Sequence, residues 1–195
     1  MNSQDILSLH DQLTKQWKNH GVQTELTGLA GLIEQNHAFN FLLWHEEDKA
    51  RRDDMGADFV YRAKRQIDQY NQKRNNAMES IDQWCFQQFK PIDDPSCPIH
   101  SETPGMMIDR LSILCLKIFH MNLQVERTDA STEHRQQCRE KYAVLKIQRD
   151  ILAQCLAQLF TEVSQGKRRF IVYQQFKMYN DPNLNPELYS QKEDA

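Results

Sequence analysis

Residues that interrupt helices are scarce in this 195-residue chain, which contains six prolines and six glycines. No proline precedes Pro91, and none lies between Pro104 and Pro182. Because proline and glycine most strongly disfavour the interior of a helix, their absence over such lengths predicts long helices. Runs that alternate apolar and polar residues with a period of two are also lacking, so we expect no sheet.

The chain also lacks the features of several functional classes. It has neither an N-terminal signal peptide nor a run of about 18 apolar residues, so we expect a cytoplasmic protein without a membrane span. A net charge of −3 disfavours a protein that coats double-stranded nucleic acid. The five cysteines form no C-x-x-C pair, which disfavours a cysteine zinc site. We expect Cys115, Cys138 and Cys155 to be reduced thiols in the core.

Apolar residues recur at helical spacing in five segments, at about 6–17, 27–52, 55–84, 104–124 and 138–163. Thr103 and Pro104 supply an N-cap and a first-turn proline for the fourth segment. We therefore predict an all-α antiparallel bundle of about five long helices, followed by a short C-terminal helix at 168–179 and an extended tail. Residues 1–166 would form the bundle domain, and 167–195 a basic and aromatic segment that docks on it.

Polar residues interrupt the apolar pattern of the second segment. Asn40, Trp44, Glu47 and Arg51 are spaced four, three and four residues apart, so they share one helical face, and Asp48 lies beside it. Because this helix is apolar around most of its circumference, we expect these polar residues to be partly buried. The alternative is a simple ion-paired stripe with Glu47 bound to Arg51.

The third segment carries a similar polar face that includes Asn71 and Asn75. A shared hydrogen-bond network and an exposed helix face both fit this pattern. Arg74 differs, because it lies in the apolar stripe and must meet a carboxylate or a bound anion.

The fourth segment is the most apolar, yet it contains Asp109, Arg110 and His120. Asp109 and Arg110 each need a counter-charge from a neighbouring helix if they are buried. A lone histidine such as His120 is more often a core residue than a ligand. Glu102 and Gly105 stand at the start of this helix, whose N-terminus is a potential anion site.

The C-terminal segment interleaves basic and aromatic residues over 167–179. Such interleaving is typical of proteins that bind single-stranded nucleic acid or a phosphorylated ligand. Docking of the aromatic side chains on the bundle is the interpretation we prefer.

Together these segments resemble a bacterial family called domain of unknown function 4254 (DUF4254). The resemblance rests on four motifs in order, NFLLWHEEDKARRDD, KRQIDQYNQKRNNAMESID, HSETPGMMIDRLSILCLKIFHM and FIVYQQFKMYNDPNLNP, and covers residues from about 30 to 189. It implies a helical cytoplasmic protein, often encoded near glycosyltransferases of cell-surface polysaccharide assembly, and no established activity.

The candidate site is an interhelical polar cluster of Asn40, Trp44, His45, Glu47, Asp48, Arg51, Asn71, Arg74, Asn75, Glu102, Asp109, Arg110 and His120. We expect a non-catalytic binding or accessory module whose partner is a glycosyltransferase or a sugar-phosphate ligand. The alternative is a Mg²⁺-dependent enzyme acting on a nucleotide, nucleotide-sugar or sugar phosphate, with Glu47, Asp48 and Asp109 as metal ligands. A third hypothesis is that the cluster only fixes the register of the helices.

Overall fold

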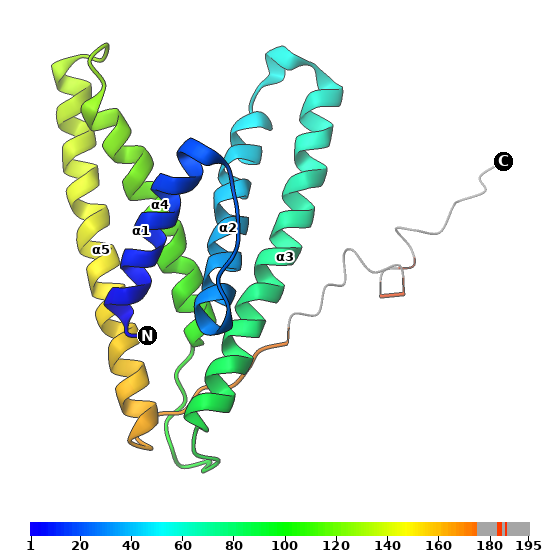
Figure 1. Cartoon of the computed structure of the whole chain (residues 1–195), viewed down its shortest axis with the longest axis vertical. Coiled ribbons are helices and arrows are strands. Elements are labelled where there is room, and N and C mark those ends of the chain that lie inside the picture. Colours follow the sequence, from blue (N-terminus) through cyan, green and yellow to red (C-terminus); the bar gives the residue numbers. More distant parts are fainter. Residues whose placement is uncertain (175–182, 185, 187–195) are drawn as a thin grey trace.

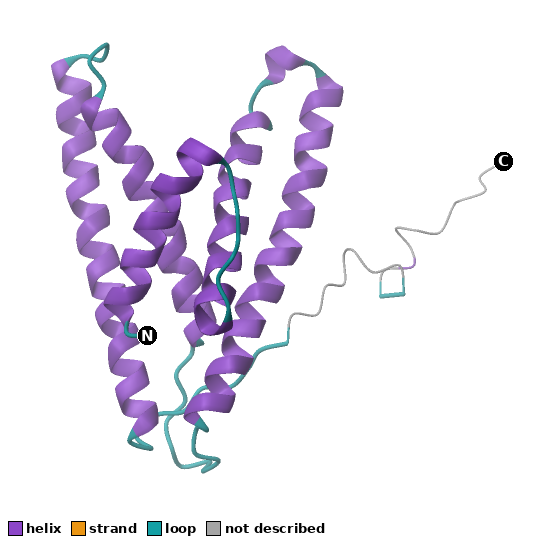
Figure 2. Ribbon diagram, viewed as in Figure 1, coloured by secondary structure: helices purple, strands orange, loops and turns teal. Residues whose placement is uncertain are grey.

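The structure is a computed structural model that describes residues 1–174, 183, 184 and 186. These residues include α1 (Ser3–His20), α2 (Gly28–Lys49), a 3-10 turn η1 (Asp53–Met55), α3 (Ala57–Phe89), α4 (Pro104–Glu126) and α5 (Thr132–Ser164). Figure 2 shows no strand in the described part of the chain, where a single isolated bridge joins Ile99 and Arg169. The predicted all-α fold with five principal helices is confirmed.

Local sequence accounts for the helix ends. The side chain of Asn2 accepts a hydrogen bond from the backbone N–H of Asp5 (2.9 Å), and Asp5 accepts one in return from the N–H of Asn2 (2.8 Å). Thr103 caps α4 as its sequence predicts, because its hydroxyl accepts from the N–H of Met106 (3.2 Å). Gly166 follows α5 with a φ of +67°, a conformation that favours glycine.

The helices form two antiparallel hairpins, α2 with α3 and α4 with α5, which diverge toward one end of the molecule (Figure 1). At the other end they pack around one core, to which every helix contributes a fully buried side chain: Ile6, Ile33, Ile81, Leu111 and Leu156. The hairpins therefore share a core at one end and are splayed at the other, and α1 lies in front of the gap between them.

One pair of neighbouring helices departs from the expected antiparallel order. Figure 1 shows α1 and α2 running in the same direction, joined by residues 21–27, which return along them. Two ring contacts agree with this direction. The ring centroids of His10 and His37 are 4.6 Å apart, and those of Trp17 and Phe41, which come later in α1 and in α2, are 5.7 Å apart. The buried carboxylate of Glu34 holds the returning segment by accepting hydrogen bonds from its backbone N–H groups.

The predicted C-terminal helix is wrong for residues 168–174, which are not helical. The backbone of Arg169 donates to the carbonyl of Pro98 (3.0 Å) and accepts from the N–H of His100 (2.8 Å). The side chain of Phe170 enters the core, with 1% of its surface exposed. These contacts hold the segment extended, so tertiary pairing overrides its helical periodicity. Residues 175–182 and most of the tail lie outside the described residues.

The cysteine prediction is partly wrong. Cys115 and Cys138 are buried, but Cys155 is exposed on α5, where it lines an open cavity between α4 and α5. No described helix is both long and apolar enough to cross a membrane.

Candidate functional site

The polar face of α2 lines a cavity of about 360 Å³ between α2, α3 and α4, which we call the inner cavity. Its lining residues are Asn40, Leu43, Trp44, Glu47, Asp48, Arg51, Arg74, Ile113 and Leu116. Six of the candidate residues thus lie together, because helical spacing places those from α2 on one face and α3 adds Arg74 opposite. Glu47 and Arg51 form the expected ion pair at 3.2 Å, and their side chains are 38% and 68% exposed.

Asp109 lies behind the inner cavity and is buried. Its Oδ1 accepts hydrogen bonds from Nδ2 of Asn36 (2.9 Å) and Nδ2 of Asn40 (2.8 Å). Nε of Arg74 is 3.9 Å from the same oxygen, so this arginine meets a carboxylate as its sequence position predicts. That Nε is buried and has no hydrogen-bond partner among the described residues. Arg74 therefore brings a charge and an unused donor to the cavity.

Trp44 also borders a second, larger cavity of about 840 Å³, which we call the outer cavity. Its lining residues are Trp44, Lys117, His120, Met121, Gln124, Glu140, Lys141, Val144, Leu145 and Gln148. The ring of His120 stacks almost parallel on Trp44, with 4.3 Å between centroids. His45 lies beside this pair, with 6.4 Å between the ring centroids of His45 and His120. Burial lowers the pKa of both histidines, which favours neutral rings and an uncharged aromatic surface.

The remaining candidate residues are not in the inner cavity. Arg110 binds Glu102 (2.7 Å), and both line a third cavity of about 710 Å³ between α4 and α5. Arg110 therefore finds its counter-charge just before its own helix, not on a neighbouring one. Asn71 and Asn75 are half-buried on α3 and are not among the described residues that line these cavities.

The described residues contain no group of three or more His, Cys, Asp or Glu side chains placed to hold a metal ion. Glu47 and Asp48 do share the inner cavity. Oδ1 of Asp109, however, accepts hydrogen bonds from the amide groups of two asparagines on α2. The expected set of three carboxylate ligands is therefore not assembled.

The N-terminus of α4, a potential anion site in the sequence, already has an acidic partner. Oδ1 of Asp82, on α3, accepts a hydrogen bond from the N–H of Gly105 (2.6 Å). Burial raises the pKa of Asp82 to about 6, although Thr103 and Gly105 act in the opposite direction. An intramolecular carboxylate thus occupies the position that an external anion would take.

Comparison with known protein families identifies the family of this chain. A family model described as "Protein of unknown function (DUF4254)" matches residues 30–172. The chain belongs to this family. The match in DUF4254 spans α2 to α5 and all three cavities, whereas α1 precedes it. No match is found among curated proteins or among solved structures.

This DUF4254 chain also buries polar residues that sequence reasoning missed, on the other side of Asp109. Thr14 Oγ1 donates to the carbonyl of His10 (2.8 Å), so it accepts from Nε2 of His37 (2.9 Å). Nδ1 of His37 then accepts from Oγ of Ser112 (2.7 Å), which itself accepts from Asn40 (3.0 Å). The order of donors assigns His37 the neutral tautomer with its proton on Nε2.

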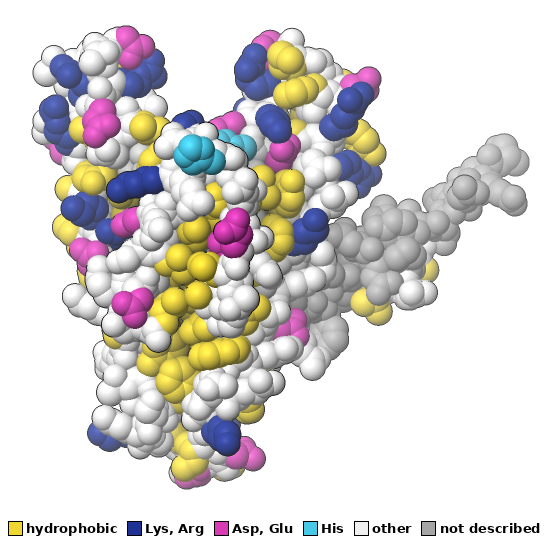
Figure 3. Space-filling view, in the orientation of Figure 1, with side chains coloured by type: hydrophobic (Ala, Val, Ile, Leu, Met, Phe, Trp, Pro, Cys, Tyr) yellow, Lys and Arg dark blue, Asp and Glu magenta, His cyan; other side chains and the backbone are white. Residues whose placement is uncertain are grey.

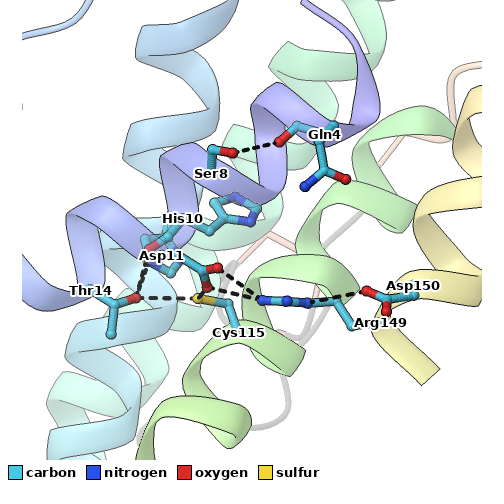
Figure 4. Close-up of polar contacts among 9 residues, drawn as sticks. Gln4, Ser8, His10, Asp11, Thr14, Cys115, Arg149 and Asp150 are labelled. Carbon is cyan, nitrogen blue, oxygen red and sulfur yellow. Dashed lines mark hydrogen bonds and ion pairs between the residues drawn. The ribbon is translucent and has the colours of Figure 1, made fainter. Parts of the chain in front are cut away.

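The same network continues to α5 (Figure 4). Sγ of Cys115 lies 3.4 Å from Thr14 Oγ1 and donates to Oδ1 of Asp11 (3.1 Å). Arg149 donates to both carboxylate oxygens of Asp11 (3.0 and 3.1 Å). Burial raises the pKa of Cys115 to about 12, so its thiol keeps the proton that it donates. All five helices therefore meet in one polar network.

A signal for this network exists in the sequence, since Asn36 and Asn40 are one helical turn apart within an apolar segment. His37 lies between them, but its partners come from α1 and α4. Spacing within α2 identifies the polar residues that interrupt its apolar pattern, but it does not identify their hydrogen-bond partners on α1 and α4.

Proposed function

We propose that this protein is a non-catalytic binding module linked to cell-surface polysaccharide assembly, and that it holds a sugar ring of its ligand beside Trp44. A sugar ring presents an apolar C–H face and a rim of hydroxyl groups that both donate and accept hydrogen bonds. A suitable site therefore combines an aromatic surface with donors and acceptors at its edge.

The inner cavity offers this combination. Trp44 supplies the aromatic surface, and its stacking on His120 fixes the ring. Arg51 and Arg74 supply donors, and Glu47 and Asp48 supply acceptors. The two positive and two negative side chains cancel, which suits a neutral polyol better than a free phosphate dianion. The observation that carries the proposal is this balanced set of donors and acceptors around Trp44.

The test is calorimetric titration of the purified protein with monosaccharides, sugar phosphates and nucleotide-sugars, each with and without Mg²⁺. Wild-type protein is expected to bind at least one sugar, and Trp44→Ala or Arg74→Gln to weaken that binding by about tenfold or more. Lys146→Gln is the matched control, because Lys146 lies on α5 in a separate cavity beside α1. Circular dichroism confirms that each variant is folded.

An enzyme remains the second candidate because Glu47 and Asp48 share the inner cavity. Mg²⁺ is often bound by one or two carboxylates together with the phosphates of a substrate. Binding that requires both Mg²⁺ and a phosphorylated sugar, followed by release of a new product, would support the enzyme. Titrations with no heat change for any ligand would leave the cluster as internal scaffolding and overturn the binding proposal.

A further inference from the structure

The three cavities are parts of one groove along α4. The inner and outer cavities share Trp44, and the outer and third cavities share Lys117 and Gln148. Ile113 in turn lines both the third and the inner cavity. The space-filling view shows the surface hollowed between the two diverging hairpins (Figure 3). A ligand held beside Trp44 can therefore extend along α4 without leaving the protein surface.

The length of the groove follows from the helix that forms its floor. Its α4 residues run from Met107 in the third cavity to Gln124 in the outer cavity. At about 1.5 Å per residue, this stretch is about 25 Å long. The two larger cavities, of about 840 and 710 Å³, are each in the size range of a site for a whole small-molecule ligand. The groove is thus longer than a single sugar ring.

The side chains along the floor alternate in character. Beyond Met107, which is only 1% exposed, α4 presents Arg110, Leu114, Lys117 and Met121, so a side chain that donates hydrogen bonds is followed by an apolar one. Ile113 and His120 lie beside this row. This order repeats at three- and four-residue intervals, which is why it follows one face of the helix.

The α5 wall of the groove is mainly apolar and carries one amide. Val144 and Ile151 are more than half exposed, at 52% and 54%, and the amide of Gln148 lies between them in the groove, whereas the exposed Ile147 (59%) is not among the lining residues. A chain of sugars presents apolar ring faces separated by hydroxyl groups, and so matches apolar side chains with hydrogen-bonding groups between them.

We propose that the ligand of this groove is an oligosaccharide, with one ring beside Trp44 and further rings along α4 and α5 toward Arg110. This inference rests on the proposed function, since it extends the same sugar site.

The test is the dependence of affinity on chain length. Calorimetry would use cello-, malto- and chito-oligosaccharides from a single ring to about six rings. At least one series is expected to bind about tenfold more tightly at full length than as a single ring. Arg110→Gln and Gln148→Ala should abolish this gain and leave single-ring binding unchanged. Lys146→Gln is the matched control, because Lys146 lies on α5 outside the groove, in a cavity beside α1.

The outcomes separate the two proposals. Equal affinity for one ring and for long chains would overturn the oligosaccharide inference while leaving the proposed function intact. Binding of no sugar at millimolar concentration would overturn both. Tight binding of an amphipathic Leu/Lys peptide of about 18 residues, with no response to oligosaccharides, would assign the groove to a protein partner instead.

Discussion

Replacement of Asp109 by alanine should lower the free energy of unfolding by about 3–5 kcal/mol. The carboxylate is buried, with 6% of the residue exposed, and it accepts the amide hydrogen bonds of Asn36 and Asn40. It is also the carboxylate nearest to Arg74. The substitution leaves both amide donors without this acceptor in the interior, and it leaves Arg74 without its nearest carboxylate.

The magnitude follows from these contacts. A buried donor that loses its acceptor costs about 1–3 kcal/mol. Asn40 loses less than Asn36 because it also donates to Ser112 (3.0 Å). The Arg74 contact adds about 1 kcal/mol or less, since its atoms are 3.9 Å apart and its side chain is 27% exposed. A typical domain is stable by about 5–15 kcal/mol, so the variant should still fold.

Urea denaturation followed by circular dichroism is the assay. With a slope of about 2–3 kcal/mol per molar urea, the midpoint should fall by about 1–2 M. Asp109→Asn keeps one acceptor oxygen and should lie between wild type and Asp109→Ala. Asp68→Ala is the control, because Asp68 is exposed and lies 3.9 Å from Arg65, and it should change stability by less than about 0.5 kcal/mol. Equal midpoints for Asp109→Ala and Asp68→Ala would refute the reasoning.

Two further predictions concern acid and close packing. Burial lowers the pKa of His37 to about 3. Between about pH 3 and pH 6.5 the unfolded chain therefore binds a proton at His37 that the folded chain does not bind, so this histidine lowers the free energy of unfolding as pH falls. At pH 5 the cost is about 2 kcal/mol relative to pH 8. Burial also lowers the pKa of His10, which acts in the same direction, whereas Asp82, with its pKa raised to about 6, acts in the opposite direction and loses its contribution as pH rises. The difference between the urea midpoints of wild type and His37→Gln at both pH values gives the part that depends on His37. Gly105→Ala should introduce a steric clash, because the added Cβ of residue 105 would collide with the carbonyl oxygen of Met78 and lie 2.8 Å from Asp82 Oδ1. The expected loss is about 1–3 kcal/mol, measured as a lower urea midpoint.

Either prediction can fail clearly. If His37→Gln loses stability between pH 8 and pH 5 as steeply as wild type, the ring is not the group that resists protonation. If Gly105→Ala unfolds at the wild-type midpoint, α3 and α4 do not approach closely at that glycine.

Much of the candidate site was predictable because it depends on spacing within single helices. The face shared by Asn40, Trp44, Glu47 and Arg51 follows from the helical repeat, and all four line the inner cavity. The position of Arg74 in an apolar stripe also predicted a carboxylate nearby. The three carboxylates expected as metal ligands do not come together, because Oδ1 of Asp109 faces two asparagine amides. The direction of a buried carboxylate depends on which donors lie closest.

Other features involve residues whose partners are distant in the sequence. His37 joins Thr14 of α1 to Ser112 of α4, and no periodicity within α2 specifies either contact. Phe170 belongs to a segment with a helical pattern, yet it is held extended because burial of the ring and pairing with residues 98–100 are available only after the bundle forms.

The sequence by itself determined the five helices and the start of α4, because the scarcity of proline and glycine, the N-cap at Thr103 and the pairing of Glu47 with Arg51 all act within a few residues. Only the tertiary structure decided that α1 and α2 run parallel, that Asp109 faces two asparagines, and that three cavities join along α4. The physical reason is that a buried polar group is stable only with a partner, and in this bundle the partners come from other helices.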